Sequence, residues 1–133
     1  MSNKYYNFYE PNILHKKEST GDCVIRALTK ALDKEWKEVF DELVPIAREK
    51  MVMLNSPECY SAYLEQNGFV KVKIPVIKGH KRPTPLTFTK THKKGTYFLS
   101  LANHVVCSKD GIYYDTWDCH DKCIYTYWEK IDK

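Results

Sequence analysis

The sequence predicts an α+β domain, with helices in the first half and a small antiparallel sheet in the second half. Apolar residues recur at helical spacing early in the chain, whereas Tyr, Val, Ile and Thr dominate the last third. The length of 133 residues suits one domain, and a hydrophobic fraction of 43% is enough for a packed core. We therefore expect residues 1–133 to form a single domain.

Two helices are expected after an irregular or extended lead-in at residues 1–20. Gly21-Asp22 opens the first helix, with Asp22 as a cap for the backbone donors of the first turn. The apolar face that follows is wide, which is typical of a central, buried helix. A second helix is expected over Lys34–Lys50, and Pro45 should kink or split it.

The middle of the chain predicts a third helix, one strand and a basic loop. Ser56-Pro57-Glu58 combines a cap, a first-turn proline and an acidic residue, and Asn67-Gly68 ends the helix. Phe69–Pro75 has the alternation of a strand. Residues 76–94 form the basic loop region, in which a short helix is expected over Leu86–His92.

The last third predicts four strands. The first is Gly95–Leu101 and the second is His104–Ser108. Asp110-Gly111 then signals a tight hairpin, from which Ile112–Asp115 returns as the next strand. Ile124–Trp128 is expected to complete the sheet.

Charge, hydropathy and cysteine content limit the classes of function. The net charge of +4 is too small to hold a protein on nucleic acid by itself. The positive charge is concentrated between Lys71 and Lys94, where no acidic residue occurs. This segment is either a solvated connector or a contact for an acidic partner. The sequence has no signal-peptide or membrane-span pattern, so we expect a cytoplasmic protein with no membrane contact. Its five cysteines are an odd number, which in this compartment favours free thiols over a set of disulfides.

Three residues predict a nucleophilic site. Cys23 lies at the start of the first helix, where the helix dipole lowers the pKa of a thiol and the Cys23 N–H can donate to an oxyanion. His104 begins a strand, and Asp115 lies on the next strand, where a carboxylate can orient the imidazole. A register change of one residue would put Asp118 in that role instead.

The motifs Gly21–Ala27, Asn103–Val106 and Tyr114–Trp117 resemble those of papain-like cysteine peptidases, most closely the compact bacterial peptidases that process bacteriocin leaders. Over Gly21–Trp128 the chain is also similar to small proteins of Firmicutes and their bacteriophages. The first resemblance implies a papain-like fold and a cysteine hydrolase (peptidase, amidase or acyl transferase) that acts on a protein or peptide substrate without a cofactor. The second implies that the compartment is the cytoplasm of a bacterial host.

The chain departs from the papain-like pattern at the oxyanion hole. That family has a glutamine about six residues before the nucleophile, whereas this chain has Lys17 there and no glutamine upstream of Cys23. The alternative side-chain donors are Thr20, Ser19 and Asn12. Loss of one oxyanion donor costs on the order of 100-fold in rate, so this position separates a working enzyme from an inactive relative.

Two other functions remain open. A phage or mobile-element protein without catalytic activity could use the basic loop and exposed aromatic residues to bind a host protein or, as a weaker signal, nucleic acid. Cys119 and Cys123, with Cys107 nearby, could in principle hold a structural zinc ion. Their spacing does not fit a standard zinc knuckle, and we expect no metal.

Overall fold

The structure is a computed structural model that describes residues 3–15 and 21–131. Its helices are α1 (Cys23–Leu32), α2 (Trp36–Lys50), α3 (Pro57–Gln66) and α4 (Pro85–Thr91). Its strands are β1 (Tyr6–Phe8), β2 (Phe69–Lys73), β3 (Thr96–Leu101), β4 (His104–Lys109), β5 (Ile112–Asp115) and β6 (Ile124–Lys130). The α+β class is confirmed.

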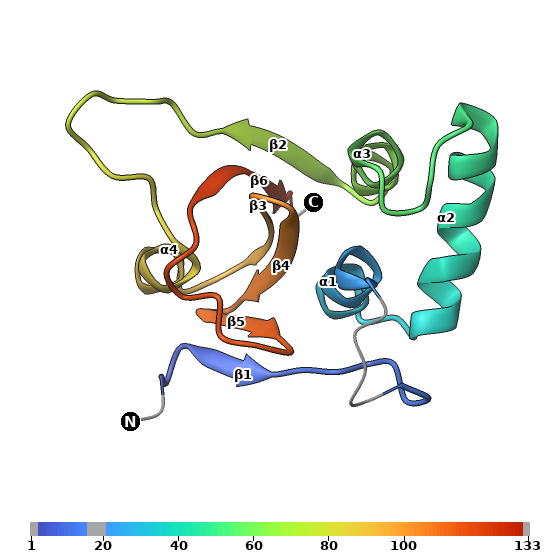
Figure 1. Ribbon diagram of the computed structural model, residues 1–133, viewed down its shortest axis with the longest axis horizontal. Coiled ribbons are helices and arrows are strands. Elements are labelled where there is room, and N and C mark those ends of the chain that lie inside the picture. The colour runs from blue at the N-terminus through green and yellow to red at the C-terminus, as the bar shows by residue number, and fades with distance from the viewer. Residues whose placement is uncertain (1–2, 16–20, 132–133) are drawn as a thin grey trace.

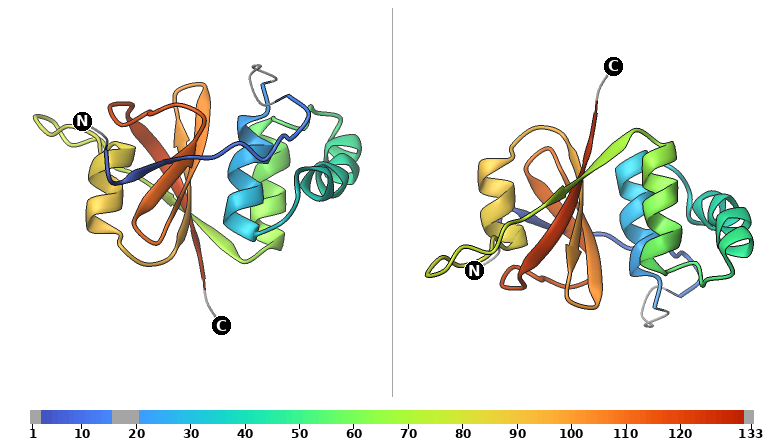
Figure 2. Two further views of the ribbon diagram at one scale, coloured as in Figure 1. Left: turned by 90° about the horizontal axis from the view of Figure 1, so that it is seen from below. Right: turned by 90° about the horizontal axis from the view of Figure 1, so that it is seen from above.

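The six strands of the described chain form one mixed sheet in the order β1-β5-β4-β3-β6-β2 (Figure 1). All neighbouring strands are antiparallel except β1 and β5, which run parallel, so the expectation of a purely antiparallel sheet was wrong. Helices α1 to α3 lie on one side of the sheet and α4 lies on the other, as both views of Figure 2 show. Among the described residues, no helix has the length and apolar character that a bilayer span needs.

The parallel strand β1 lies within the expected lead-in and holds the end of β5 in place. Phe8 is in register with Asp115. The backbone N–H of Tyr9 donates to the Asp115 carbonyl at 2.9 Å, and the Tyr6 hydroxyl donates to the same carbonyl at 3.1 Å. A strand of three residues whose partner lies far away in the sequence leaves no periodic signal, which is why the sequence did not predict it.

Both faces of the sheet are buried, each by its own hydrophobic cluster. One cluster joins α1, α2 and α3 to strand residues that include Val105 and Cys107. The other includes Phe88 of α4 and Val106. Successive side chains of β4 therefore enter opposite clusters, as the period of a strand requires. This packing lays α1 directly against β4.

The hairpin between β4 and β5 has the expected geometry. Asp110 and Gly111 both have positive φ, 50° and 83°, which is the pattern of a type I′ turn. The turn sets the register in which Cys107 faces Tyr114. It thereby returns Asp115 to the end of the sheet at which β4 begins.

The helices agree with the sequence in type and differ in two details. α2 begins at Trp36 and continues unbroken through Pro45, so the expected kink or split is not confirmed. Pro45 is exposed and its ring lies in solvent, while the residues that follow it remain packed in the core. α3 begins as expected, since the Ser56 hydroxyl accepts from the Glu58 N–H at 3.3 Å.

Candidate active site

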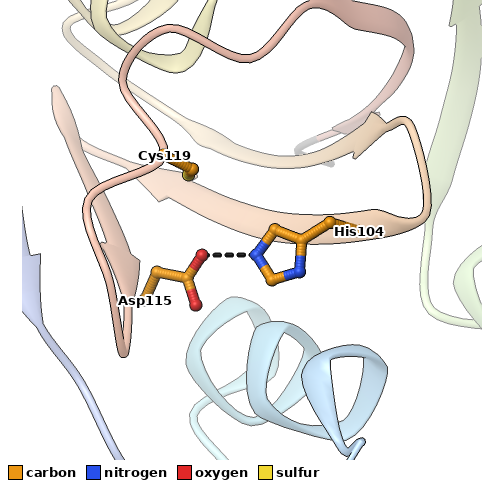
Figure 3. A group of neighbouring side chains, drawn as sticks. All are labelled: His104, Asp115 and Cys119. Carbon is orange, nitrogen blue, oxygen red and sulfur yellow. Dashed lines mark hydrogen bonds and ion pairs between the residues drawn. The ribbon is translucent and has the colours of Figure 1, made fainter.

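Cys23, His104 and Asp115 are brought together at the ends of three elements. Cys23 is the first residue of α1, His104 the first of β4 and Asp115 the last of β5. His104 Nε2 lies 2.5 Å from Asp115 Oδ2 (Figure 3). The second ring nitrogen of His104 is directed toward α1 (Figure 3). The interaction of the imidazole with the Cys23 thiol, at the start of that helix, shifts the pKa values of both groups.

The surroundings of Cys23 favour its thiolate. Burial opposes ionisation, but a hydrogen bond with His104 and one with the backbone of Val105 outweigh it. The positive charges of His104 and Arg26 act in the same direction. The pKa of Cys23 is therefore lower than that of an ordinary cysteine, as a nucleophilic thiol requires.

The surroundings of His104 favour its protonated form. Burial lowers the pKa of the imidazole, but hydrogen bonds with Asp115 and with Cys23 raise it to about 9. The lowered pKa of Cys23 and the raised pKa of His104 both favour the thiolate–imidazolium form of the pair over the neutral form. Such a pair supplies both a nucleophile and a proton donor.

Asp115 is fully buried and is surrounded by donors. Besides His104, its carboxylate accepts from Arg26 Nη2 at 2.9 Å and from the Thr116 N–H at 2.8 Å. The Cys119 thiol lies within 4.8 Å of this carboxylate, and burial together with the Asp115 charge raises the pKa of that thiol. A buried carboxylate with this many donors is held in one orientation.

Asp118 has other partners, so Asp115 is the carboxylate at the imidazole. The Tyr113 hydroxyl donates to Asp118 Oδ1 at 2.5 Å, and the His120 N–H donates to the same oxygen at 3.0 Å. The register left open by the sequence is thus the one that places Asp115 beside His104.

Arg26 is a member of the site that the sequence analysis missed. It lies three residues after Cys23 and so on the same side of α1, and only 7% of it is exposed. Its guanidinium joins Asp115 to Asp22, with Nη1 at 3.2 Å from Asp22 Oδ1. The sequence feature that could have identified Arg26 is the occurrence of a charged residue within the broad apolar face of the first helix.

Asp22 does not cap α1 with its side chain, in contrast to the prediction. Its carboxylate accepts instead from Arg26 and from Trp36 Nε1, the latter at 2.8 Å. The first-turn N–H groups of a helix, here including that of Cys23, have no partner within the helix. Without a side-chain cap from Asp22, the Cys23 N–H can donate to an oxyanion.

The remaining oxyanion candidates receive no support from the structure. Asn12 is engaged in a local turn, where its Oδ1 accepts from the Leu14 N–H at 3.3 Å. Ser19 and Thr20 lie outside the described residues.

The three cysteines considered as zinc ligands are not brought together. Cys107 and Cys119 are buried in different clusters, and Cys123 is exposed. Within residues 3–15 and 21–131, the one group with metal-ligand geometry is His104, Asp115 and Cys119, whose ligand atoms lie within 4.8 Å of one another. Arg26 already neutralises Asp115 at 2.9 Å, and its positive charge disfavours a metal cation there.

The two shifted pKa values predict how stability depends on pH. His104, with its pKa raised from 6.5 to about 9, contributes stability that is complete below pH 6.5 and is lost as the pH rises through 9. Cys23, with its pKa lowered from 9.0, contributes stability that is present above pH 9 and is lost as the pH falls through its folded-state pKa. In the wild-type protein, the contributions of His104 and Cys23 to stability change in opposite directions with pH and offset each other.

Substitution of Cys23 by serine should therefore expose the contribution of His104, because Asp115 still raises the imidazole pKa. The free energy of unfolding of Cys23→Ser should fall, relative to wild type, as the pH rises from 6.5 toward 9. Urea titrations across this range measure the difference. Parallel pH profiles for the two proteins would show that the thiol and the imidazole are not coupled.

Comparison of the chain with protein-family models, with curated proteins and with solved structures gave no match. The resemblances of the sequence motifs gain no support from these comparisons. The function is therefore argued from the geometry of the site.

Proposed function

We propose that this protein is a cysteine hydrolase of papain-like architecture that acts on a protein or peptide substrate. The observation that carries the proposal is the continuous interaction from the Cys23 thiol through His104 to the buried Asp115 carboxylate. A nucleophile, a base and an orienting group in hydrogen-bond contact are the requirements of acyl transfer.

In the proposed reaction, the Cys23 thiolate attacks the carbonyl carbon and the backbone N–H of Cys23 stabilises the oxyanion. The His104 imidazolium donates its proton to the leaving group, which departs and leaves a thioester on Cys23. His104 then accepts a proton from water, whose oxygen attacks the thioester and releases the acid. Asp115 keeps the imidazole oriented throughout, and Arg26 holds the Asp115 carboxylate in place.

Alkylation of the five cysteines by iodoacetamide near neutral pH tests the proposal. Cys23 should react fastest, since its pKa is lowered, whereas burial raises the pKa values of Cys59, Cys107 and Cys119. Cys123 is exposed and serves as the internal reference. Rates are measured by mass spectrometry of the digested protein. Slow labelling of Cys23, at or below the rate of Cys123, would refute the proposal.

A second candidate function is binding of a partner by the basic loop. Between β2 and α4 the loop exposes 80% of Val76 and 55% of Ile77, and the Arg82 guanidinium lies 4.5 Å from the centre of the Tyr125 ring. Exposed apolar side chains beside cations are typical of a surface that contacts an acidic partner. Partner capture that weakens steeply with salt, and weakens further in Lys81→Glu/Arg82→Glu, would favour this function.

A further inference from the structure

The loop between β2 and α4 contains a cavity of about 330 Å³, whose lining residues all lie between Ile74 and Pro83. Both ends of this segment are fixed to β6. The Ile74 N–H donates to the Tyr125 carbonyl at 3.4 Å, and the Pro83 carbonyl accepts from the Ile124 N–H at 2.9 Å. The walls of the cavity are therefore anchored to the sheet through the backbone at both ends.

The ionisable residues in the lining are all bases, namely His80, Lys81 and Arg82. Within the described part of the chain, neither Lys81 nor Arg82 forms an ion pair. The sequence between Lys71 and Lys94 has no acidic residue, so no neighbour in the loop neutralises these cations. A cavity walled by cations without counter-charges attracts an anion.

Arg82 has a hydrogen-bond donor without an acceptor. Its guanidinium lies on the face of the Tyr125 ring, 4.5 Å from the ring centre, and this contact positions it. Among residues 3–15 and 21–131, none accepts from Arg82 Nη1, although this atom is buried. A buried N–H without an acceptor is costly, and its usual explanation is a missing partner. Because Arg82 also lines the cavity, an anion seated there supplies that acceptor once the guanidinium turns toward it.

The remaining walls of the cavity are apolar and open to solvent. Val76 and Ile77 both line it, and they are 80% and 55% exposed. A free inorganic anion, or the phosphate of a nucleic acid, would leave these two side chains uncovered. An acidic side chain in a peptide brings apolar neighbours that cover them, which is favourable. The combination thus favours an acidic and partly apolar peptide segment.

We propose that this cavity binds the carboxylate of one Asp or Glu side chain of a protein partner, with an adjacent apolar residue of the partner packed on Val76 and Ile77. Arg82 makes the specific contact, because a planar guanidinium donates two parallel N–H bonds to one carboxylate, whereas Lys81 acts as a point charge. The inference rests on the second candidate function and gives the chemistry of that partner.

Three peptides of the form acetyl-Gly-Leu-Xaa-Leu-Gly-amide, with Glu, Gln or phosphoserine as Xaa, test the inference. Each is titrated into the isotope-labelled protein, and the dissociation constant is obtained from the NMR chemical shifts of the loop amides. The Glu peptide should bind about tenfold more tightly than the Gln peptide, as expected for a hydrogen bond to a charged group.

Variants of Arg82 separate the specific contact from the overall charge of the loop. Arg82→Gln should reduce the preference for Glu over Gln to about twofold or less. Arg82→Lys keeps the charge but cannot donate the paired hydrogen bonds, so it should also weaken binding of the Glu peptide. Lys78→Gln is the matched control, since it removes one positive charge from the same loop outside the lining, and it should leave the preference unchanged.

The outcomes distinguish this inference from the function on which it rests. Equal loss of preference in Lys78→Gln and Arg82→Gln would overturn the inference and leave binding by the basic loop intact, because the summed charge would then account for the affinity. Tight binding of the phosphoserine peptide alone would overturn the carboxylate in favour of a phosphorylated partner. Equal affinities for all three peptides would overturn both the inference and the second candidate function.

Discussion

Replacement of Asp115 by alanine is expected to lower the free energy of unfolding by about 3–5 kcal/mol, the usual cost of removing one partner from a buried ion pair. The variant leaves Arg26, of which 7% is exposed, with Asp22 as its remaining acidic partner. It also removes the carboxylate that accepts from His104. Urea denaturation followed by circular dichroism measures the loss.

Asp33→Ala is the matched control for Asp115→Ala. Asp33 also pairs with a cation, Lys109 Nζ at 2.8 Å, but its side chain is 74% exposed. Such pairs contribute about 0–1 kcal/mol. A loss for Asp115→Ala no larger than that for Asp33→Ala would contradict the buried network described for the site.

The variant His104→Gln should slow alkylation of Cys23 by about tenfold or more at neutral pH. Without the imidazole, its hydrogen bond and its charge no longer lower the pKa of the thiol, so that pKa rises and the thiolate fraction falls. One pKa unit changes that fraction about tenfold when the thiol is mostly protonated. The rate is followed for each cysteine by mass spectrometry.

His80→Gln provides the control, because His80 is exposed in the basic loop. The rate at Cys123 should be the same in both variants and in the wild-type protein. If His104→Gln left the rate at Cys23 unchanged, the imidazole would have no role in activating the thiol.

The local elements were predictable because their signals are short and self-contained. Asp110-Gly111 requires positive φ at two successive residues, and Ser56-Pro57 begins a helix by its own hydrogen bond and ring geometry. The pairing of Cys23 with His104 was expected from the resemblance to papain-like peptidases, because the sequence by itself does not show which distant residues meet.

The parts of the site that the sequence did not predict depend on tertiary contacts. Arg26 acquires its role only because α1 packs where its guanidinium reaches Asp115, 89 residues later in the chain. Strand β1 exists through its pairing with β5, and Asp22 bonds to Trp36 of the next helix instead of capping its own. The type and spacing of these residues do not predict their tertiary contacts, since for each of them a local interaction would be an equally good alternative.

The pH dependence of Cys23 alkylation in the wild-type protein tests the central claim most directly. When the pH falls from about 8.5 to about 6.5, the thiolate fraction of an ordinary thiol such as glutathione decreases roughly fiftyfold. Because the pKa of Cys23 is lowered by its contact with His104, its alkylation rate should fall distinctly less over this range. A profile that parallels that of glutathione would contradict a thiolate–imidazolium pair in the folded protein.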